Sequence, residues 1–195
     1  MSTWAGTKLE DRKAARRAQL LDAAIDLLGA SDGPALSVRA ACRHAKLTER
    51  YFYESFPDRE ALVVATYEHV GALAHQALVD AVQAAPTPDA RAEAAVTAFV
   101  ELIVDDPSKG RVLLLAPTTE PALSRRGVEL LPAFAALVRG QLSSGADDLD
   151  RQMTAIGLVG ALANLFIGYL DGTLEVPRDR LVGHCVALVL NADKP

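Results

Sequence analysis

Apolar residues recur at helical spacing in almost every segment of the chain. The first clear stripe consists of Leu20, Leu21, Ala24, Ile25 and Leu28. This i, i+1, i+4, i+5, i+8 spacing places the side chains on one face of a helix. Alanine occurs 35 times and only 5% of the residues are aromatic, which favours helices over strands. We therefore predict an all-α fold with about nine helices and no strand.

Capping residues and prolines set the expected ends of these helices. Ser37 and Thr48 are suitable N-caps for two short helices. The segment 86–89, Pro-Thr-Pro-Asp, is the clearest linker. Pro132 is expected to kink or split a helix that begins near Pro121. The expected helices span a segment up to residue 29, then 37–45, 48–56, 59–85, 89–105, 108–116, a segment from 121, 147–169 and 177–191.

Charge is unevenly distributed along the chain. Its 195 residues carry a net charge of −5, which taken alone argues against nucleic-acid binding. Residues 1–60, however, carry ten basic and nine acidic side chains, whereas residues 61–195 carry ten and sixteen. Five of the basic groups lie between Lys8 and Arg17, where only two acidic residues accompany them. The two parts are therefore expected to bind different partners.

Cysteine usage and hydropathy predict a cytoplasmic protein without a membrane partner. Cys42 and Cys185 are 143 positions apart, so no disulfide framework is indicated. The first residues lack the pattern of a signal peptide. The longest stretch of low polarity, residues 155–170, spans 16 residues, whereas a bilayer requires about 20. We interpret this stretch as a buried helix.

Residues 37–56 have the layout of a helix-turn-helix. Two short helices are joined by a tight turn at Lys46 and Leu47, and the second has the size to enter a major groove about 12 Å wide. The inward positions are small or apolar, namely Val38, Ala41, Cys42, Ala45, Leu47 and Phe52. The outward positions on the second helix are Glu49, Arg50, Tyr51, Tyr53 and Glu54. The same pattern also fits a structural helical hairpin with a solvated polar face.

Two side chains of this segment suit contacts to duplex DNA. Thr48 lies at a helix N-terminus, where its hydroxyl, the backbone N–H groups and the helix dipole favour a phosphate. Arg50 has the planar fork that bridges O6 and N7 of guanine, worth about 1–3 kcal/mol of discrimination.

Residues 37–62 read SVRAACRHAKLTERYFYESFPDREAL. They resemble the TetR (tetracycline-repressor-like) family of bacterial transcription regulators, whose pattern is [ST]-V-x-x-I-A-x-x-A-G-V-S-x-x-x-L-Y-x-x-F-x-x-K-x-x-L. The match covers residues 17–62 and lapses beyond them. It implies a helix-turn-helix DNA-binding domain over residues 1–58, followed by a helical ligand-binding and dimerisation domain over residues 59–195.

The resemblance implies DNA-binding roles for seven residues. They are Arg39 at a base or phosphate, Thr48 and Tyr53 at phosphates, Glu49, Arg50 and Tyr51 at base edges, and Arg59 in place of a phosphate-binding lysine.

Three departures from the family pattern concern the same segment. They are Lys46 in place of the turn glycine, Ala41-Cys42 in place of Ile-Ala, and Ser55 where an aromatic residue or histidine is common. If the turn requires positive φ, Lys46 costs on the order of 1 kcal/mol, offset by its charge near phosphate. The basic segment from Lys8 to Arg17 is expected either to contact DNA as a flexible arm or to be a solvated tail.

The end of the chain is expected to form a dimer interface. Small or polar residues recur along the penultimate helix at Gly157, Ala161, Asn164 and Gly168. Such a stripe lets helices approach closely, and an operator-reading helix-turn-helix normally acts as a two-fold dimer. We predict a homodimer through a four-helix bundle of residues 148–169 and 177–191, including Leu181, Cys185 and Leu188. The alternative is an intramolecular core.

The resemblance also implies a cavity for a largely apolar small molecule among the helices between residues 59 and 140. The candidate lining residues are Tyr67, Phe99, Leu102, Ile103, Leu115 and Phe134, although ordinary core packing explains them equally well. The HExxH, CxxC, GxSxG and Walker motifs are absent from the sequence. We therefore predict a protein that is not an enzyme and needs no metal or cofactor.

Together these features predict a sequence-specific transcriptional regulator, a repressor released from operator DNA by a small molecule. A bound ligand would shift the helix over residues 59–85 and change the spacing of two recognition helices, which must lie about 34–36 Å apart. Two alternatives remain, an all-α dimeric ligand-binding protein without operator recognition and an α-helical enzyme with dispersed catalytic residues.

Overall fold

The computed structural model describes residues 3–31, 35–124, 126–142 and 147–192, and the side chains of residues 3–9 and 126–129 fall outside this description. Its helices are α1 (Thr3–Gly29), α2 (Val38–Ala45), α3 (Glu49–Tyr53), α4 (Arg59–Ala84), α5 (Pro88–Ile103), α6 (Pro107–Leu114), α7 (Ala116–Thr119), the 3-10 helix η1 (Pro121–Leu123), α8 (Arg126–Arg139), α9 (Asp148–Asp171) and α10 (Arg178–Asn191). Within these residues there is no strand, and the prediction of an all-α fold is confirmed.

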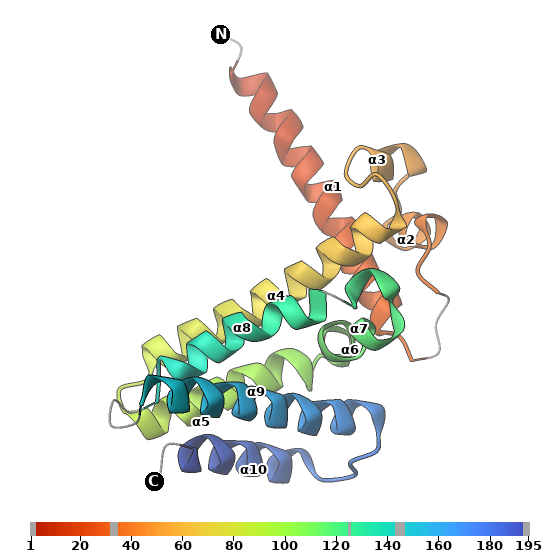
Figure 1. The fold of residues 1–195 in the computed structure, drawn as a ribbon. Coiled ribbons are helices and arrows are strands. Elements are labelled where there is room, and N and C mark those ends of the chain that lie inside the picture. Colours follow the sequence, from red (N-terminus) through yellow and green to blue (C-terminus); the bar gives the residue numbers. More distant parts are fainter. Residues whose placement is uncertain (1–2, 32–34, 125, 143–146, 193–195) are drawn as a thin grey trace.

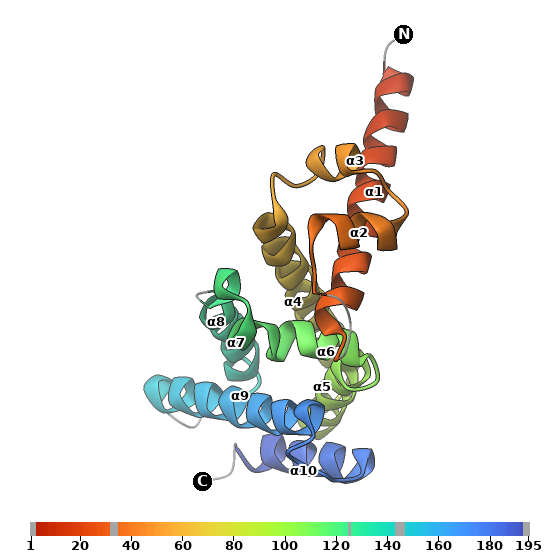
Figure 2. The same cartoon turned by 90° about the vertical axis from the view of Figure 1, so that its right-hand side faces the viewer.

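Helix α4 connects two groups of helices. At its start lie α2 and α3, beside the long α1 that extends toward the N-terminus (Figure 1). Helix α8 runs along α4, while α9 and α10 lie side by side at the opposite end of the molecule (Figure 1 and Figure 2). The segment expected to carry the DNA contacts is therefore well separated from the predicted dimer helices.

Five helices begin at a residue whose side chain accepts a hydrogen bond from the first turn. These residues are Ser37, Asp58, Thr87, Asp106 and Asp147. The bonds satisfy N–H groups that a helix start leaves unpaired. Prolines occupy an early position in α5 and α6, where the missing N–H has no intrahelical partner. Local sequence thus explains where most of the helices begin.

One face of α4 lies at the centre of the core. Leu62, Val63 and Val70 are fully buried, and Tyr67 is nearly so. Thr66 is the one polar residue buried in this face, and its hydroxyl donates to the carbonyl of Leu62 at 2.8 Å. Because that bond satisfies the hydroxyl, α4 packs against α1, α5, α6 and α8 without an unpaired polar group here.

The predicted helix from Pro121 is wrong at its start. Residues 121–123 form η1 instead, and α8 begins at Arg126. Pro132 lies inside α8 and does not split it. A proline removes one intrahelical hydrogen bond, and the packing of α8 between α4 and α9 supports the helix on both sides of it.

The basic segment from Lys8 to Arg17 belongs to α1 and is not an extended arm. Its alanines, arginines and lysines are strong helix formers, which favours continuation of the helix toward the N-terminus. The side chain of Lys8 lies outside the described residues. From Glu10 to Arg17 the segment is almost entirely exposed.

Two glycines allow the backbone of α6 to lie close to its neighbours. Gly29 ends α1 against Ser108 of α6, and Gly110 of α6 lies against Ile103 at the end of α5. A Cβ on Gly29 would lie 2.4 Å from the Cα of Ser108, and the carbonyl of Gly29 accepts a hydrogen bond from Arg111 at 3.2 Å. A Cβ on Gly110 would lie 2.1 Å from the carbonyl oxygen of Ile103. Any other residue at these positions must push backbone away.

We expect Gly110→Ala to destabilise the protein by about 1–3 kcal/mol or more, because its Cβ meets backbone that cannot rotate aside. The matched control is Gly140→Ala, whose Cβ would make only ordinary contacts at 3.5 Å. Urea denaturation followed by circular dichroism measures both free energies of unfolding. Equal stability of the two variants would contradict the packing of α6 against the end of α5.

Candidate nucleic-acid interface and ligand cavity

The turn between α2 and α3 is closed by backbone hydrogen bonds. The N–H of Lys46 donates to the carbonyl of Arg43 at 3.3 Å, and the N–H of Leu47 donates to that of Cys42 at 2.9 Å. Lys46 has φ 55° and ψ 37°, and in the described part of the chain no other non-glycine residue has positive φ. The conformation that favours glycine is therefore present here, and Lys46 carries its cost of about 1 kcal/mol.

The two short helices pack through the residues that the sequence places inward. Ala41, Cys42 and Phe52 are buried, and the other three predicted inward residues are half-buried. Burial, with a smaller contribution from the charge of Glu49, raises the pKa of the Cys42 thiol. Phe52 packs edge-on against the ring of Tyr53 at a centroid distance of 5.3 Å. The predicted hairpin is confirmed as a packed unit.

The outer face of this unit presents polar side chains to solvent. Arg50 and Arg39 are 86% and 84% exposed, and Tyr53 is 58% exposed. Glu49 is exposed beside Arg39, 3.5 Å from its Nε. Thr48 occupies the N-cap position of α3, but its side chain makes no capping hydrogen bond. Its hydroxyl is therefore available to a ligand at the helix N-terminus.

Tyr51 lies apart from these exposed residues, because α1 covers it. The guanidinium of Arg16 lies 4.3 Å from the centre of the Tyr51 ring, and that of Arg17 lies at the same distance from the ring of Phe56. Arg17 also donates to the carbonyl of Ser55 at 3.3 Å. Both arginines thus hold α3 against α1, a role that the sequence analysis missed because only the fold brings them to these rings.

Arg59 is also engaged within the protein. Its Nε donates to the carbonyl of Leu36 at 2.8 Å, and its two terminal nitrogens donate to the carboxylate of Glu120 at 3.0 and 2.5 Å. The hydrogen bond to Glu120 is the largest cause of a raised Arg59 pKa. The predicted phosphate-binding residue therefore connects the loop before α2 to the segment between α7 and η1.

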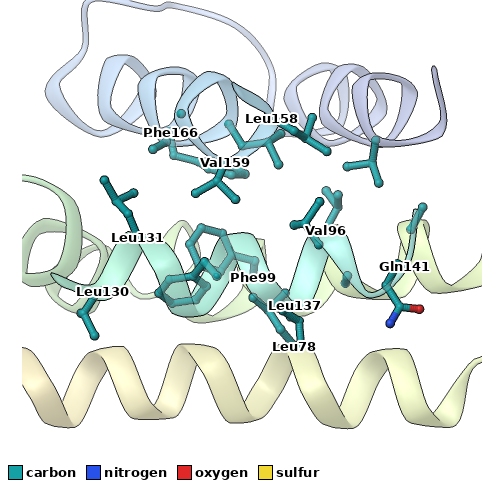
Figure 3. A pocket seen from close by; sticks show the side chains of 18 of the residues that line it. Leu78, Val96, Phe99, Leu130, Leu131, Leu137, Gln141, Leu158, Val159 and Phe166 are labelled. Atoms are coloured by element: carbon teal, nitrogen blue, oxygen red, sulfur yellow. The ribbon is translucent and has the colours of Figure 1, made fainter. Parts of the chain in front are cut away.

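A second candidate site is an apolar cavity of about 510 Å³ lined mainly by α4, α5, α8 and α9. In Figure 3, Leu158, Val159 and Phe166 extend from α9 toward side chains of α5 and α8, among them Phe99 and Leu131. Its size lies within the range typical of small-molecule sites, and its lining is predominantly apolar.

Three of the six predicted lining residues border this cavity, namely Tyr67, Phe99 and Phe134. The other three, Leu102, Ile103 and Leu115, do not, and their assignment is corrected. Ile103 is fully buried, and its backbone carbonyl oxygen lies against Gly110 of α6. Apolar periodicity on α5 marks two faces, and only the fold decides which one borders a cavity.

The sequence analysis also missed the contribution of α9 to the cavity. Leu158, Leu162 and Phe166 line it, although this helix had been assigned to the dimer interface. Their i, i+4, i+8 spacing defines one stripe, distinct from that of Gly157 and Ala161. Both stripes are free of charged residues, and this feature of the sequence could have indicated that α9 has two buried faces.

Few polar groups border the cavity among the described residues. They include Asp89 and Arg91 at the start of α5, Ser124 after η1, Gln141 just after α8 and Asn164 of α9. The Nε of Arg91 donates to the carbonyl of Ala85 at 3.3 Å, so this side chain also closes the end of α4. Burial raises the pKa of Tyr67 to about 12, which keeps its hydroxyl protonated at neutral pH.

The exposed face of α9 carries the predicted small-residue stripe. Gly157, Ala161 and Asn164 are exposed, and Met153 and Ile156 beside them are both 56% exposed. A Cβ on Gly157 would have no neighbour within 4 Å. This face is unpartnered within the chain.

The assignment of α10 residues to an interface needs correction. Leu181 and Cys185 are buried in the chain's own core, and burial raises the pKa of Cys185 to about 11. Leu188 is half-buried. A Cβ on Gly168 would meet Leu174 of the same chain at 3.3 Å, so close packing there serves the following loop. The inward face of α10 completes the fold.

By length and composition α9 also satisfies the criteria for crossing a membrane. Its 24 residues exceed the 16 residues of low polarity counted in the sequence. Only 17% of its most apolar 18-residue window is buried within the chain. One such helix is weak evidence for a membrane span, since core helices of soluble proteins pass the same test.

No protein-family model and no curated protein matches the chain. Solved structures resemble it over most of its length. The fatty acid degradation regulator FadR from Bacillus halodurans has a TM-score of 0.73 at 17% identity, over 90% of this chain and 94% of that one. A TetR family transcription regulator from Marinobacter aquaeolei VT8 has a TM-score of 0.65 at 17% identity, over 94% and 97%.

FadR from Bacillus subtilis in complex with stearoyl-CoA is similar as well, with a TM-score of 0.68 at 15% identity over 91% of this chain and 97% of that one. The chain therefore has the fold of these transcription regulators, which extends the resemblance seen in residues 37–62 to both groups of helices.

We expect Ala95→Trp, which places an indole in the cavity, to weaken binding of the apolar dye 1-anilinonaphthalene-8-sulfonate by tenfold or more. The dye and the indole would compete for one volume of about 510 Å³. Ala72→Trp, at an exposed position of α4 outside the cavity lining, is the control and should leave dye binding unchanged. Equal dye affinity in both variants, measured by fluorescence titration, would contradict an accessible cavity.

Proposed function

We propose that the protein is a sequence-specific DNA-binding transcriptional regulator, and specifically a repressor released from its operator by a small molecule. The observation that carries the proposal is the pairing, in one chain, of an exposed helix-turn-helix face with an apolar cavity, in a fold shared with transcription regulators. The two sites are joined by α4, which begins beside α3 and lines the cavity through Tyr67 and Leu78.

In this proposal the exposed side chains around α3 read the operator. Arg50 and Glu49 contact base edges in the major groove, and Arg39 contacts a base or phosphate. Thr48 and Tyr53 bind phosphates, which fix the position of the helix on the duplex. Tyr51 contributes through its hydroxyl at the edge of this surface, since its ring packs against Arg16.

The active species is proposed to be a homodimer. Two recognition helices on one duplex require a two-fold axis. The exposed apolar face of α9, containing Met153, Ile156, Gly157 and Ala161, is the surface that a second copy would cover. Leu188 and the exposed residues of α10 would border the same contact, because α10 packs beside α9.

The effector is proposed to be a largely apolar small molecule. The cavity wall consists mostly of aliphatic and aromatic side chains, and the related FadR from Bacillus subtilis holds stearoyl-CoA. A ligand that binds the released state about 10⁴-fold more tightly would shift the protein from mostly bound to mostly free. The described residues contain no cluster of three potential metal ligands. We also propose a cytoplasmic location, which fits a DNA-binding role.

We expect Arg50→Ala to weaken binding to the operator by about 1–3 kcal/mol, roughly 5- to 150-fold, because a bidentate base contact is lost. The measurement is fluorescence anisotropy with a duplex selected from a random pool by the wild-type protein. Affinity of the wild type should fall steeply with salt as counterions are released.

Arg139→Ala is the control for this measurement, since Arg139 lies at the end of α8, where it pairs with Asp148. Its affinity should equal that of the wild type. A wild-type protein that enriches no duplex would overturn the proposed function, and equal losses in both variants would remove Arg50 from the interface.

We expect Ile156→Glu to convert the dimer to a monomer of 20.7 kDa, because it places a charge in an apolar contact. Sedimentation velocity at micromolar concentration measures the change. Leu73→Glu, at an exposed leucine of α4, is the matched control and should remain dimeric. A wild-type protein that sediments only as a monomer would refute the interface.

A further inference from the structure

Three arginines of the helix-turn-helix and the start of α4 are neutralised by carboxylates of the same chain. The pairs are Arg39 with Glu49 at 3.5 Å, Arg50 with Glu54 at 3.4 Å, and Arg59 with Glu120 at 2.5 Å. The first two pairs are single contacts between exposed side chains, which are readily broken by solvent or by a phosphate. The third pair is different in kind.

The Arg59–Glu120 pair is bidentate and largely shielded. The side chains of Arg59 and Glu120 are 35% and 16% exposed, whereas Arg50 is 86% exposed. Two parallel N–H···O bonds to a carboxylate are stronger and more directional than a single contact. The third donor of the guanidinium, Nε, is held by the carbonyl of Leu36. Both the charge and the orientation of Arg59 are therefore set inside the protein.

Glu120 lies in the segment between α7 and η1, beside the cavity wall, whereas the other two carboxylates belong to the helix-turn-helix itself. Its N–H donates to the carbonyl of Ala116 in α7 at 2.8 Å, and its carbonyl accepts from Leu123 in η1 at 2.9 Å. Pro117 and Ser124, on either side of it, line the cavity. The backbone that carries the Glu120 carboxylate is therefore held by hydrogen bonds on both sides.

We propose that Glu120 withholds Arg59 from the DNA backbone. The proposal rests on the proposed DNA-binding function. Arg59 is the first residue of α4, and its guanidinium lies next to Leu36, directly before the Ser37 cap of α2. The N-termini of α2 and α4 meet at this point and are capped by Ser37 and Asp58, so the guanidinium of Arg59 is the group there that a phosphate would contact.

The two partners of Arg59 compete for one cation. While Glu120 holds the guanidinium, Arg59 neutralises no phosphate and adds nothing to counterion release. When this pair opens, Arg59 gains a phosphate contact. Each phosphate neutralised on duplex DNA changes the slope of log K against log [salt] by about 0.9. The salt dependence therefore reports the partner of Arg59 without requiring the identity of the natural ligand.

The test compares Glu120→Gln with the wild type on a duplex of random sequence and on the selected operator. The substitution removes the charge that holds Arg59 and keeps the size of the side chain. We expect affinity for the random duplex at low salt to rise several-fold, and the salt slope to steepen by about 0.9 per subunit. The double variant Arg59→Gln/Glu120→Gln should lose this gain, because the released cation is then absent.

Asp105→Asn provides the matched control. Asp105 forms a similar bidentate pair with Arg178, at 2.7 and 2.6 Å, but far from α2 and α3. For Asp105→Asn, the slope of log K against log [salt] should equal that of the wild type. If circular dichroism shows that Glu120→Gln does not fold, Glu120→Asp replaces it, since the shorter acid weakens the pair while keeping the charge, and a smaller increase in slope is expected.

Three outcomes are decisive. A steeper slope and tighter binding in the Glu120 variant, lost in the double variant, would support the proposal. Equal or weaker DNA binding with an unchanged slope would overturn it and assign the pair a purely structural role, while leaving the proposed function intact. A wild type that binds neither duplex at low salt would overturn the proposed function and this inference together.

Discussion

The burial of one face of α4 is the constraint on which both sites depend. This helix of 26 residues places Leu62, Val63, Tyr67 and Val70 in the core and contacts α1, α5, α6 and α8. Its start is held beside α2 by Arg59, and its second half borders the cavity. Because packed helices shift between discrete arrangements and bend little, a displacement at one end of α4 is felt at the other.

The cavity is the point at which this packing is incomplete. An apolar space of about 510 Å³ forgoes the dispersion contacts that a filled core would make. Helix α9 is incompletely packed on two faces. Leu158 and Phe166 face the cavity, while Met153 and Ile156 face solvent. A small molecule on the inner face and a second copy on the outer face would complete the burial of this helix. The two proposed partners therefore act on a single element.

Local features of the sequence were sufficient to locate most of the helices and the helix-turn-helix. The cap at Ser37 follows from residue chemistry within a few positions, whereas the left-handed position at Lys46 was indicated by the family pattern, which has glycine there. Sequence was insufficient where a residue had more than one compatible neighbour. Arg16 and Arg17 were placed in a segment expected to be either a DNA-contacting arm or a solvated tail, yet they lie over aromatic rings of residues 35 and 39 positions away. Periodicity likewise could not decide that Ile103 lies outside the cavity lining or that Cys185 faces the core.

The amino-acid sequence by itself determined the all-α class, the start of each capped helix and the segment with the chemistry to read DNA. These properties depend on hydrogen bonds and steric preferences within one or two helical turns. Only the tertiary structure decided which apolar face lines the cavity, which stripe of α9 remains exposed, and which carboxylate holds Arg59. Those outcomes depend on contacts between helices distant in sequence, such as the 61 positions between Arg59 and Glu120, and on the volumes that remain when the helices have packed.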